Sequence, residues 1–294
     1  MQTRVPKDKD GLLLSQFLMQ TAGDIPVRAI RETIKKRDVR VDGVRIAGDM
    51  RVSEGQEIRV FWPKSVLTAE KKPLPAPDIV FEDERVLLIN KPQGIASQNE
   101  EDPSLGDTAL TRAVSYLKGR NEETDRVHLC HRLDVQTGGL LLIVKDDEAY
   151  ESAVRAFTDR TFRKFYTCRV KGCPARREET MRAYLRKDAH ISRVVITDYP
   201  ARGAQEIVTA YRVTEAGEYA RLEVELITGR THQIRAHLAH IGHPILGDDK
   251  YGDRLLNRQL GLRRQQLWAT RMEFFTEGAL AYLNGRSFSV KCPF

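Results

Sequence analysis

The segment that most restricts the fold is Leu140 to Val144, five consecutive apolar residues that follow the glycine pair Gly138-Gly139. A short apolar run bounded by a turn is typical of a strand that is buried on both faces. The loop before it, His131-Arg132-Leu133-Asp134, places one carboxylate at the mouth of this strand, close to glycines that let a ligand approach the backbone. Asp134 is therefore a candidate site residue, although an Asp in a turn often only bonds its own backbone.

The charge balance of the chain favours a polyanionic partner. Lys and Arg number 48 and Asp and Glu 41 among 294 residues, so the formal net charge is +7. Nucleic acid is the first partner that such a balance suggests, and an anionic membrane surface is the second. Nothing in the sequence implies an obligate protein partner.

The expected location follows from segments that the sequence lacks. It contains no run of roughly 18 apolar residues that could span a membrane, and residues 1–8 form no apolar signal segment. The four cysteines show no CxxC pairing and have no secretory context. We therefore expect a cytoplasmic protein with reduced thiols and no membrane association.

A proline-rich polar segment, residues 64–78, is typical of an extended linker and divides the chain. Residues 1–63 are predicted to form a small domain of two helices and a β-ribbon. Its expected elements are helices over 12–18 and 26–34, the second opened by Pro26, a hairpin turning at Asp42-Gly43, and a strand over 57–61. About 60 residues bury only a small core, so this domain is expected to be marginally stable alone.

Basic side chains gather in the second predicted helix and in the loop after it. They are Arg28, Arg31, Lys35, Lys36, Arg37 and Arg40, against only Glu32 and Asp38 in the same stretch. Such a run is often only a solvated helix face, but its clustering on one helix and the following loop favours phosphate binding.

Residues 79–294 are predicted to form the larger domain. Strands are expected near 79–84, 86–90, 127–130, 140–144, 162–170, 206–213 and 219–226, and helices near 108–117 and 148–157. Most of these strands follow one another without an intervening helix. This order favours an α+β fold with a mixed, mainly antiparallel sheet over a doubly wound one.

A second motif is the stretch from Thr228 to Leu238, in which a strand ends, Gly229 turns, and a helix begins with Thr231 as its expected N-cap. Apolar spacing over 234–241 and a glycine at 242 predict where this helix runs and ends. Arg230 then lies at a helix N-terminus, a place that favours anions, where an arginine can pair with a carboxylate or hold a phosphate. An arginine there that simply faces solvent is the plainer alternative.

A third motif, Arg163-Lys164-Phe165-Tyr166, lies early on a predicted strand. Alternation places Lys164 and Tyr166 on one face and Phe165 on the other. A tyrosine can stack on a base and still offer its hydroxyl, although a core tyrosine is the commoner finding.

Together the three motifs resemble the RluA class of pseudouridine synthases, from Ile79 to the C-terminus. The matching segments are His131 to Asp134 with Thr137 to Leu140, Thr228 to Leu238, Gly242 to Asp248, Lys250 to Gly252, and the turn Lys91-Pro92-Gln93-Gly94. Residues 1–63 resemble the S-four-like RNA-binding domain, which also occurs in this class. They depart from it in the first helix, where Leu13 stands in place of the family's usual arginine.

The resemblance implies an isomerase that converts uridine in RNA to pseudouridine. The bond from ribose to the base nitrogen breaks, the uracil turns, and it rejoins through carbon, without hydrolysis or net redox change. No cofactor and no metal are therefore expected. The chemistry needs a dry pocket, one carboxylate beside the sugar, and a buried cation that keeps this carboxylate ionised. Ribosomal RNA of the large subunit is the commonest substrate type in the class, and transfer RNA is the alternative.

The resemblance also implies roles for single residues. Asp134 is the essential carboxylate, which attacks or stabilises an intermediate, and Arg230 is expected to pair with it. Tyr166 would pack on the base and take part in proton transfer, while Arg132 would hold a phosphate or fill the gap left by the extruded nucleotide. The remaining candidates for contact with RNA are Lys164, Thr228 and Gln233 in the larger domain and Arg28, Arg31, Lys35, Lys36 and Arg37 in the smaller one.

Three other functions compete with this interpretation. The histidines at 232, 237, 240 and 243 could suggest a zinc site, but no acidic or cysteine partner accompanies them in the motif. A non-catalytic RNA-binding or ribosome-assembly protein would be expected to lack Asp134, which is present. A retaining glycosidase would need a second carboxylate in the motif of Asp134, which the sequence does not supply.

Overall fold

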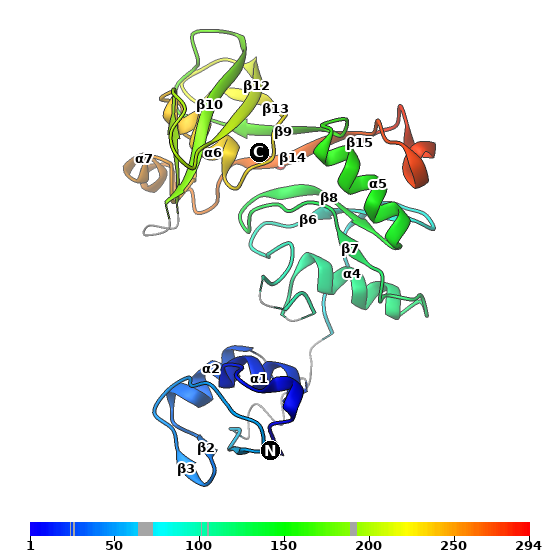
Figure 1. The fold of residues 1–294 in the computed structure, drawn as a ribbon. Coiled ribbons are helices and arrows are strands. Elements are labelled where there is room, and N and C mark those ends of the chain that lie inside the picture. The colour runs from blue at the N-terminus through cyan, green and yellow to red at the C-terminus, as the bar shows by residue number, and fades with distance from the viewer. Residues whose placement is uncertain (24, 26, 64–72, 101, 105, 189–192) are drawn as a thin grey trace. The chain divides into compact units, whose positions relative to one another are not determined.

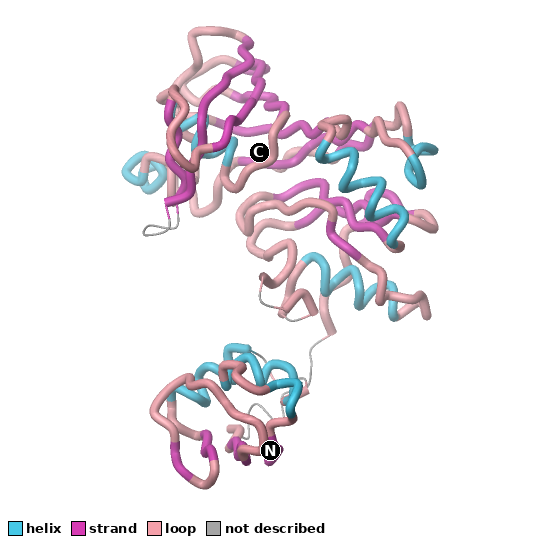
Figure 2. Tube along the Cα trace, in the orientation of Figure 1, coloured by secondary structure: helices cyan, strands magenta, loops and turns pink. Residues whose placement is uncertain are grey.

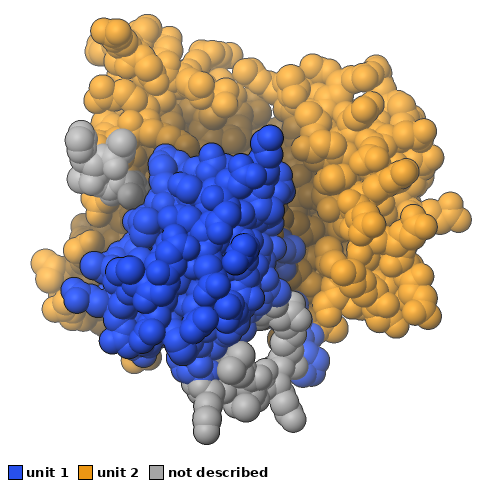
Figure 3. Space-filling model, turned by 60° about the horizontal axis from the view of Figure 1, so that its bottom comes forward, with its two compact units in different colours: residues 1–74, 104–106 blue, residues 75–103, 107–294 orange. Residues whose placement is uncertain are grey.

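The computed structural model describes the chain from Met1 to Phe294 except residues 24, 26, 64–72, 101, 105 and 189–192. It divides into two compact units, one of residues 1–74 with 104–106 and one of residues 75–103 with 107–294 (Figure 3). Each unit is described by itself. Most of the expected linker, 64–78, and the predicted helix start at Pro26 lie outside the described residues.

The described residues of the first unit form two α-helices and a four-stranded sheet in the order β1-β4-β2-β3. Its elements are β1 (Gln2–Arg4), a 3-10 turn (Lys7–Lys9), α1 (Leu14–Thr21), α2 (Val27–Lys35), β2 (Val39–Val41), β3 (Val44–Arg45) and β4 (Glu57–Val60). The predicted helices and ribbon are confirmed, and β1 is an addition. Asp42 and Gly43 both have positive φ, 49° and 80°, which suits the tight hairpin turn between β2 and β3.

The core of this unit is small but continuous. Leu14, Phe17 and Leu18 of α1 and Ile30 of α2 are buried together with the inward residues of the sheet. Asp49 fixes the start of α1, since its carboxylate accepts hydrogen bonds from the backbone N–H and the hydroxyl of Ser15, at 2.9 and 2.6 Å. A polar cap from 34 residues away therefore replaces the usual cap by the preceding residue.

The second unit is built on one sheet of eleven strands, in the order β11-β10-β12-β13-β9-β14-β8-β6-β5, with β15 beside β14 and β7 beside β8 (Figure 1). The strands are β5 (Ile79–Glu82), β6 (Val86–Lys91), β7 (His128–Leu129), β8 (Gly138–Val144), β9 (Arg163–Arg169), β10 (Glu178–Asp188), β11 (Arg193–Thr197), β12 (Gln205–Glu215), β13 (Arg221–Leu226), β14 (Leu267–Glu273) and β15 (Ser287–Ser289). The helices are α4 (Ala109–Lys118), α5 (Asp147–Thr158), α6 (Gln233–His240), α7 (Arg254–Gln259) and a 3-10 helix, η2 (Gly278–Leu283).

Every described pairing in this sheet is antiparallel except the one between β14 and β8. The expected α+β fold with a mixed, mainly antiparallel sheet is confirmed. Six of the described elements of this unit were not expected from the sequence: β10, β11, β14, β15, α7 and η2.

Strand β8 lies at the centre of the core, and all seven of its residues are buried. Leu141 and Ile143 pack on the side of α4, while Leu140, Leu142 and Val144 pack on the side of α5. Figures 1 and 2 show these two helices on either side of β6 and β8. The predicted strand buried on both faces is therefore confirmed.

The glycine pair at the start of β8 allows β14 to approach. A Cβ on Gly138 would lie 2.3 Å from the ring of Trp268, and one on Gly139 would lie 2.2 Å from the carbonyl oxygen of Ala269. Gly139 also has φ +110°, which side-chain-bearing residues rarely adopt. Glycine is thus required where the loop that carries Asp134 enters the sheet.

Candidate active site

The loop of Asp134 is fixed by hydrogen bonds on both of its sides. The hydroxyl of Ser97 accepts from the backbone N–H of Leu133 and donates to its carbonyl, both at 2.9 Å. The N–H of Thr137 donates to the carbonyl of Asp134 at 3.0 Å and closes the turn. The Asp134 side chain keeps 25% of its surface exposed, so it reaches solvent from a rigid support.

Lys91 fixes this loop by hydrogen bonds to backbone carbonyls. Its side chain is fully buried, and Nζ donates to the carbonyls of Pro92 and Ile95 at 3.0 and 2.9 Å, with that of Val135 at 3.5 Å. Burial lowers the pKa of Lys91 to about 8, while the negative charge of Asp134 acts in the opposite direction. The Lys-Pro-x-Gly turn noted in the sequence therefore ties the strand end of β6 to the carboxylate loop.

The cation that pairs with Asp134 is Arg235, not Arg230 as predicted. Nη1 of Arg235 lies 2.8 Å from Oδ2 of Asp134, and the Arg235 side chain is only 5% exposed. Arg230 lies in the exposed loop before α6, where its backbone N–H donates to the side chain of Gln233. The expected N-cap was also wrong, because His232 occupies this position and α6 begins at Gln233.

Arg235 is held in turn by Asp248, which is completely buried. Nε and Nη2 of the guanidinium donate to the two carboxylate oxygens at 2.7 and 2.9 Å, a bidentate pairing. Burial alone would raise the pKa of Asp248, but the hydrogen bonds and charge of Arg235 outweigh it and lower the pKa. The guanidinium thus bridges Asp248 inside the protein and Asp134 at its surface.

Gln233 and Thr228, both predicted to contact RNA, are hydrogen-bonded to each other inside the protein. Gln233 is 2% exposed, and its amide donates to the carbonyl of Val208 and the hydroxyl of Thr209 at 3.1 and 3.0 Å. Its amide oxygen accepts from the hydroxyl of Thr228 at 2.8 Å. These bonds fix the start of α6 against β12. Thr228 also lines the cleft, so its contact with RNA stays a prediction, whereas Gln233 is buried away from it.

Tyr166 and Lys164 come from β9 and line the same cleft as Asp134. Burial, and to a lesser extent the charge of Asp134, raises the pKa of Tyr166, so its hydroxyl stays protonated at neutral pH. Burial lowers the pKa of Lys164 to about 8, and its Nζ lies 4.8 Å from the ring centre of Phe157. The predicted alternation is confirmed, since Phe165 lines a pocket on the other face.

The cleft has a volume of about 1210 Å³ and mixes one central carboxylate with many basic side chains. The basic residues along it are Arg132, Arg160, Lys164, Lys187, Arg230, Arg235 and Lys250. Arg132 is exposed at its edge and forms an ion pair of 2.9 Å with Glu100. Such an edge can bind the phosphates of a nucleic-acid strand, and the interior can hold one nucleoside.

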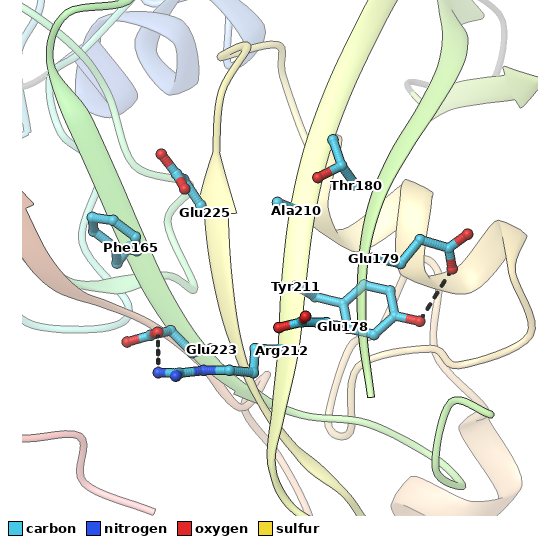
Figure 4. A pocket seen from close by; sticks show the side chains of 9 residues that line it. All are labelled: Phe165, Glu178, Glu179, Thr180, Ala210, Tyr211, Arg212, Glu223 and Glu225. Atoms are coloured by element: carbon cyan, nitrogen blue, oxygen red, sulfur yellow. Dashed lines mark hydrogen bonds and ion pairs between the residues drawn. The ribbon is translucent and has the colours of Figure 1, made fainter. Parts of the chain in front are cut away.

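The opposite face of the sheet carries a smaller pocket of about 390 Å³, drawn in Figure 4. Four glutamates line it, Glu178, Glu179, Glu223 and Glu225, and Arg212 pairs with Glu223 at 2.9 Å. Three of the four glutamates form ion pairs, Glu179 with Arg176, Glu223 with Arg212 and Arg271, and Glu225 with Arg163, so most of the acidic charge of this pocket is neutralised.

Histidines 232, 237, 240 and 243 do not converge. Their ring nitrogens lie within hydrogen-bond distance of Tyr251, Thr209, Asp198 and the carbonyl of Lys171, respectively. Across the described residues, no group of three or more His, Cys, Asp or Glu side chains is arranged to hold a metal ion. Nor does any described helix have the length and apolarity needed to cross a membrane.

The side chains of the first unit that are predicted to contact RNA lie on α2 and the turn after it. Arg31, Lys35, Lys36 and Arg37 are all exposed there, whereas the side chain of Arg28 is outside the described part. Their phosphate-binding role stays a prediction.

Comparison with known proteins gives consistent results. The sequence model of a family described as RNA pseudouridylate synthase matches residues 85–240. The ribosomal large subunit pseudouridine synthase C of Escherichia coli strain K12 is 30% identical over 291 residues, covering 93% of this chain and 88% of that protein. The uncharacterized RNA pseudouridine synthase YhcT of Bacillus subtilis is 31% identical over 265 residues, covering 88% and 85%.

The fold is also found among solved structures. Human RNA pseudouridylate synthase domain containing 4 matches with a TM-score of 0.59 and 24% identity, over 73% of this chain and 88% of that chain. The predicted resemblance of the larger domain is thereby confirmed. The chain belongs to the RNA pseudouridylate synthase family, and it is an enzyme that isomerises uridine in RNA to pseudouridine.

Proposed function

We propose that this enzyme modifies uridine in large-subunit ribosomal RNA and that the reaction depends on the carboxylate of Asp134. The observation that carries the second part is the placement of this carboxylate, which faces the cleft while a buried arginine holds it at 2.8 Å. The first part is supported by the printed names of the relatives from Escherichia coli and Vibrio parahaemolyticus, both large-subunit synthases. Transfer RNA is the alternative target.

Asp134 acts on a nucleoside that has left its stack and entered the cleft. The bond between N1 and C1′ breaks, the bond between C5 and C1′ forms, the hydrogen of C5 leaves and N1 gains one, so atoms and electrons balance. Arg235 orients the carboxylate through a charge-assisted hydrogen bond of 2.8 Å to Oδ2. Attack on the sugar, attack on the base and elimination each use this same carboxylate.

Tyr166 supplies the flat surface for the base. It is 4% exposed and stays a phenol at neutral pH, so it can pack on the uracil and hold one proton near the sugar. Extruding the nucleotide costs a few kcal/mol, least where the uridine is already looped or bulged. Arg132 and Lys164 offset this cost, because they bind phosphates or fill the gap that the extruded nucleotide leaves.

In this proposal the first unit increases the affinity for RNA and contributes no side chain to the reaction. Replacing Arg31, Lys35 and Lys36 by alanine together should weaken RNA binding and flatten the slope of log affinity against log salt by about 2. Turnover of bound RNA should stay unchanged. Equal affinity of wild type and triple variant in a filter-binding titration would exclude this role.

Tritium release from RNA labelled at C5 of uridine tests the function. Wild type, Asp134→Asn and the exposed-site control Asp147→Asn are each given large-subunit rRNA, small-subunit rRNA and a tRNA pool. We expect release from large-subunit rRNA by wild type and control and none by Asp134→Asn. Release from tRNA alone would identify the alternative target, and release by Asp134→Asn would remove Asp134 from the mechanism. Since the proposed substrate is ribosomal RNA, we also infer a cytoplasmic location.

A further inference from the structure

His232 makes contacts that the reaction as described does not use. It precedes α6 in a left-handed backbone conformation, with φ 55° and ψ 16°, which is uncommon for a residue other than glycine. Its side chain is 15% exposed and lies at the wall of the cleft. Nε2 is 3.9 Å from Oδ2 of Asp134, and Nδ1 is 3.0 Å from the hydroxyl of Tyr251. A strained backbone therefore directs one ring nitrogen at the central carboxylate.

The contacts of Tyr251 decide which nitrogen of His232 carries the proton. The phenol oxygen already accepts the backbone N–H of Val194 at 2.9 Å. Burial raises the pKa of Tyr251, so the hydroxyl keeps its single hydrogen, and within the described residues Nδ1 of His232 is the acceptor in reach. If Tyr251 donates to Nδ1, a neutral ring has its hydrogen on Nε2.

Electrostatics supports the same tautomer. A bare Nε2 would turn its lone pair toward the carboxylate of Asp134, which is unfavourable, whereas Nε2–H turns a donor toward it. Burial, more than any single charge, lowers the pKa of His232, and Arg235 and Lys250 act in the same direction while Asp134 and Asp248 oppose them. The ring is therefore neutral at pH 7 and still a donor at Nε2.

Arg235 and His232 both approach the same oxygen of Asp134. Nη1 of Arg235 donates to Oδ2, and Nε2 of His232 is nearest to Oδ2 as well. In the described part of the chain, the side-chain hydrogen bond to Asp134 is made to Oδ2 and none is made to Oδ1. The carboxylate is thus oriented with one oxygen toward the protein and one toward the cleft.

We propose that His232 is a positioning residue whose Nε2–H, oriented by the Tyr251 hydroxyl, holds Oδ2 of Asp134 so that Oδ1 is the oxygen that meets the nucleoside. This inference rests on the proposed role of Asp134. The 3.9 Å separation lies beyond hydrogen-bond range in the free enzyme, and the proposal requires it to shorten into that range when the nucleoside enters the cleft. His232 acts through Asp134 and forms no bond to the substrate.

Two amide substitutions separate this role from a structural one. The amide nitrogen of Gln in His232→Gln lies as many bonds from the backbone as Nε2, whereas that of Asn in His232→Asn corresponds to Nδ1. Asn adopts the left-handed backbone more readily than Gln. A purely structural role therefore predicts Asn as the milder change, and the positioning role predicts Gln.

We expect kcat in the tritium assay to fall about tenfold in His232→Asn and no more than about threefold in His232→Gln. KM for RNA should stay within about twofold of wild type in both, and thermal unfolding should show Asn at least as stable as Gln. An active enzyme in which Asn equals or exceeds Gln overturns the inference. No release by wild type from any RNA would instead overturn the proposed function.

A spectroscopic measurement reads the tautomer without turnover. Long-range ¹H–¹⁵N correlation of the histidine rings, with His232 assigned by its loss in His232→Gln, should show the hydrogen on Nε2 in the free enzyme. Tyr251→Phe keeps the ring and removes the hydroxyl, so it should mix the two tautomers. A hydrogen on Nδ1 in wild type, or no change in Tyr251→Phe, overturns the inference.

Discussion

Asp248 and Asp249 are adjacent in the sequence, and both contact Arg235. Replacing each of them in turn therefore measures how much a carboxylate partner of Arg235 contributes to the stability of the protein. Asp248 is fully buried and accepts from Nε and Nη2 of Arg235 at 2.7 and 2.9 Å. Asp249 lies 3.5 Å from Nη2 with 78% of its side chain exposed. Asn at either position removes the same charge with little change of shape, so burial is the main difference between the two variants.

The magnitudes follow from that difference. Asp248→Asn leaves a buried guanidinium beside a neutral amide, and breaking a buried ion pair costs about 3–5 kcal/mol. We take about 3 kcal/mol, because Asp134 still accepts from Arg235. For a unit of this size Tm falls by roughly 2–4 °C per kcal/mol, so Asp248→Asn should lose roughly 6–12 °C. Asp249→Asn should lose no more than about 2 °C, since an exposed pair contributes less than about 0.5 kcal/mol.

Tryptophan fluorescence can report on the catalytic unit alone. The two tryptophans are Trp62 in the first unit and Trp268 beside Gly138 in the second. In a Trp62→Phe background, the thermal transition of Trp268 follows the sheet that carries the site. Equal losses of Tm for Asp248→Asn and Asp249→Asn, or a loss under about 2 °C for Asp248→Asn, would refute the reasoning.

The same variant has a pH signature. Arg235 holds the pKa of Asp248 below its usual value, so this stabilisation is fully present above the pKa of the unfolded carboxyl. It is lost as the pH falls through the lowered value. The difference in Tm between wild type and Asp248→Asn should therefore shrink in strong acid, and a constant difference would contradict the assignment.

Three further changes test other parts of the site. The charge of Lys164 should be lost as the pH rises through about 8, so the difference in RNA affinity between wild type and Lys164→Met should fade between pH 7 and 9 in filter binding; a constant difference would contradict this. Gly139→Ala should lower the free energy of unfolding in urea by at least about 2 kcal/mol more than Gly94→Ala, because Gly94 has a similar φ of +96° but open space around it; equal losses would contradict the clash. Tyr166→Phe should lower kcat for tritium release by about 100-fold or more with little change of KM, and an unchanged kcat would remove the hydroxyl from the chemistry.

The sequence predicted those strands whose pattern is local. Strand β8 is a continuous apolar run, and the β2–β3 hairpin has Asp-Gly at its turn, so each could be placed from a few residues. Strand β10 alternates Met181, Ala183 and Leu185 inward between polar residues, a local pattern typical of a half-buried strand. Strand β14 joins the two halves of the sheet by pairing with both β9 and β8, and partners so distant in sequence leave no local pattern.

The candidate site was predicted in part for the same reason. Asp134 stands out because a lone carboxylate precedes a buried strand, and the structure places it in the cleft with Tyr166 and Lys164. Its cation was misassigned because the helix N-terminus favoured Arg230, whereas burial decides the pairing. Arg235 lies in the first turn of α6 and is fixed by Asp248, thirteen positions later, a contact that neither motif reveals alone.

The distribution of charge explains how a basic protein can direct RNA toward a carboxylate. At the floor of the cleft, Arg235 lies between the carboxylates of Asp134 and Asp248, so its positive charge is already balanced and is not offered to a phosphate. The basic side chains along its edge, Arg132 and Lys187 among them, attract the backbone instead. Therefore only an uncharged part of the RNA is stabilised by binding deeper in the cleft. That part is a nucleoside extruded from its stack, because a base within folded RNA can be reached only in this form. On the opposite face, the arginines beside the smaller pocket are already paired with its glutamates, so the edge of the cleft is the place where basic side chains can bind the backbone.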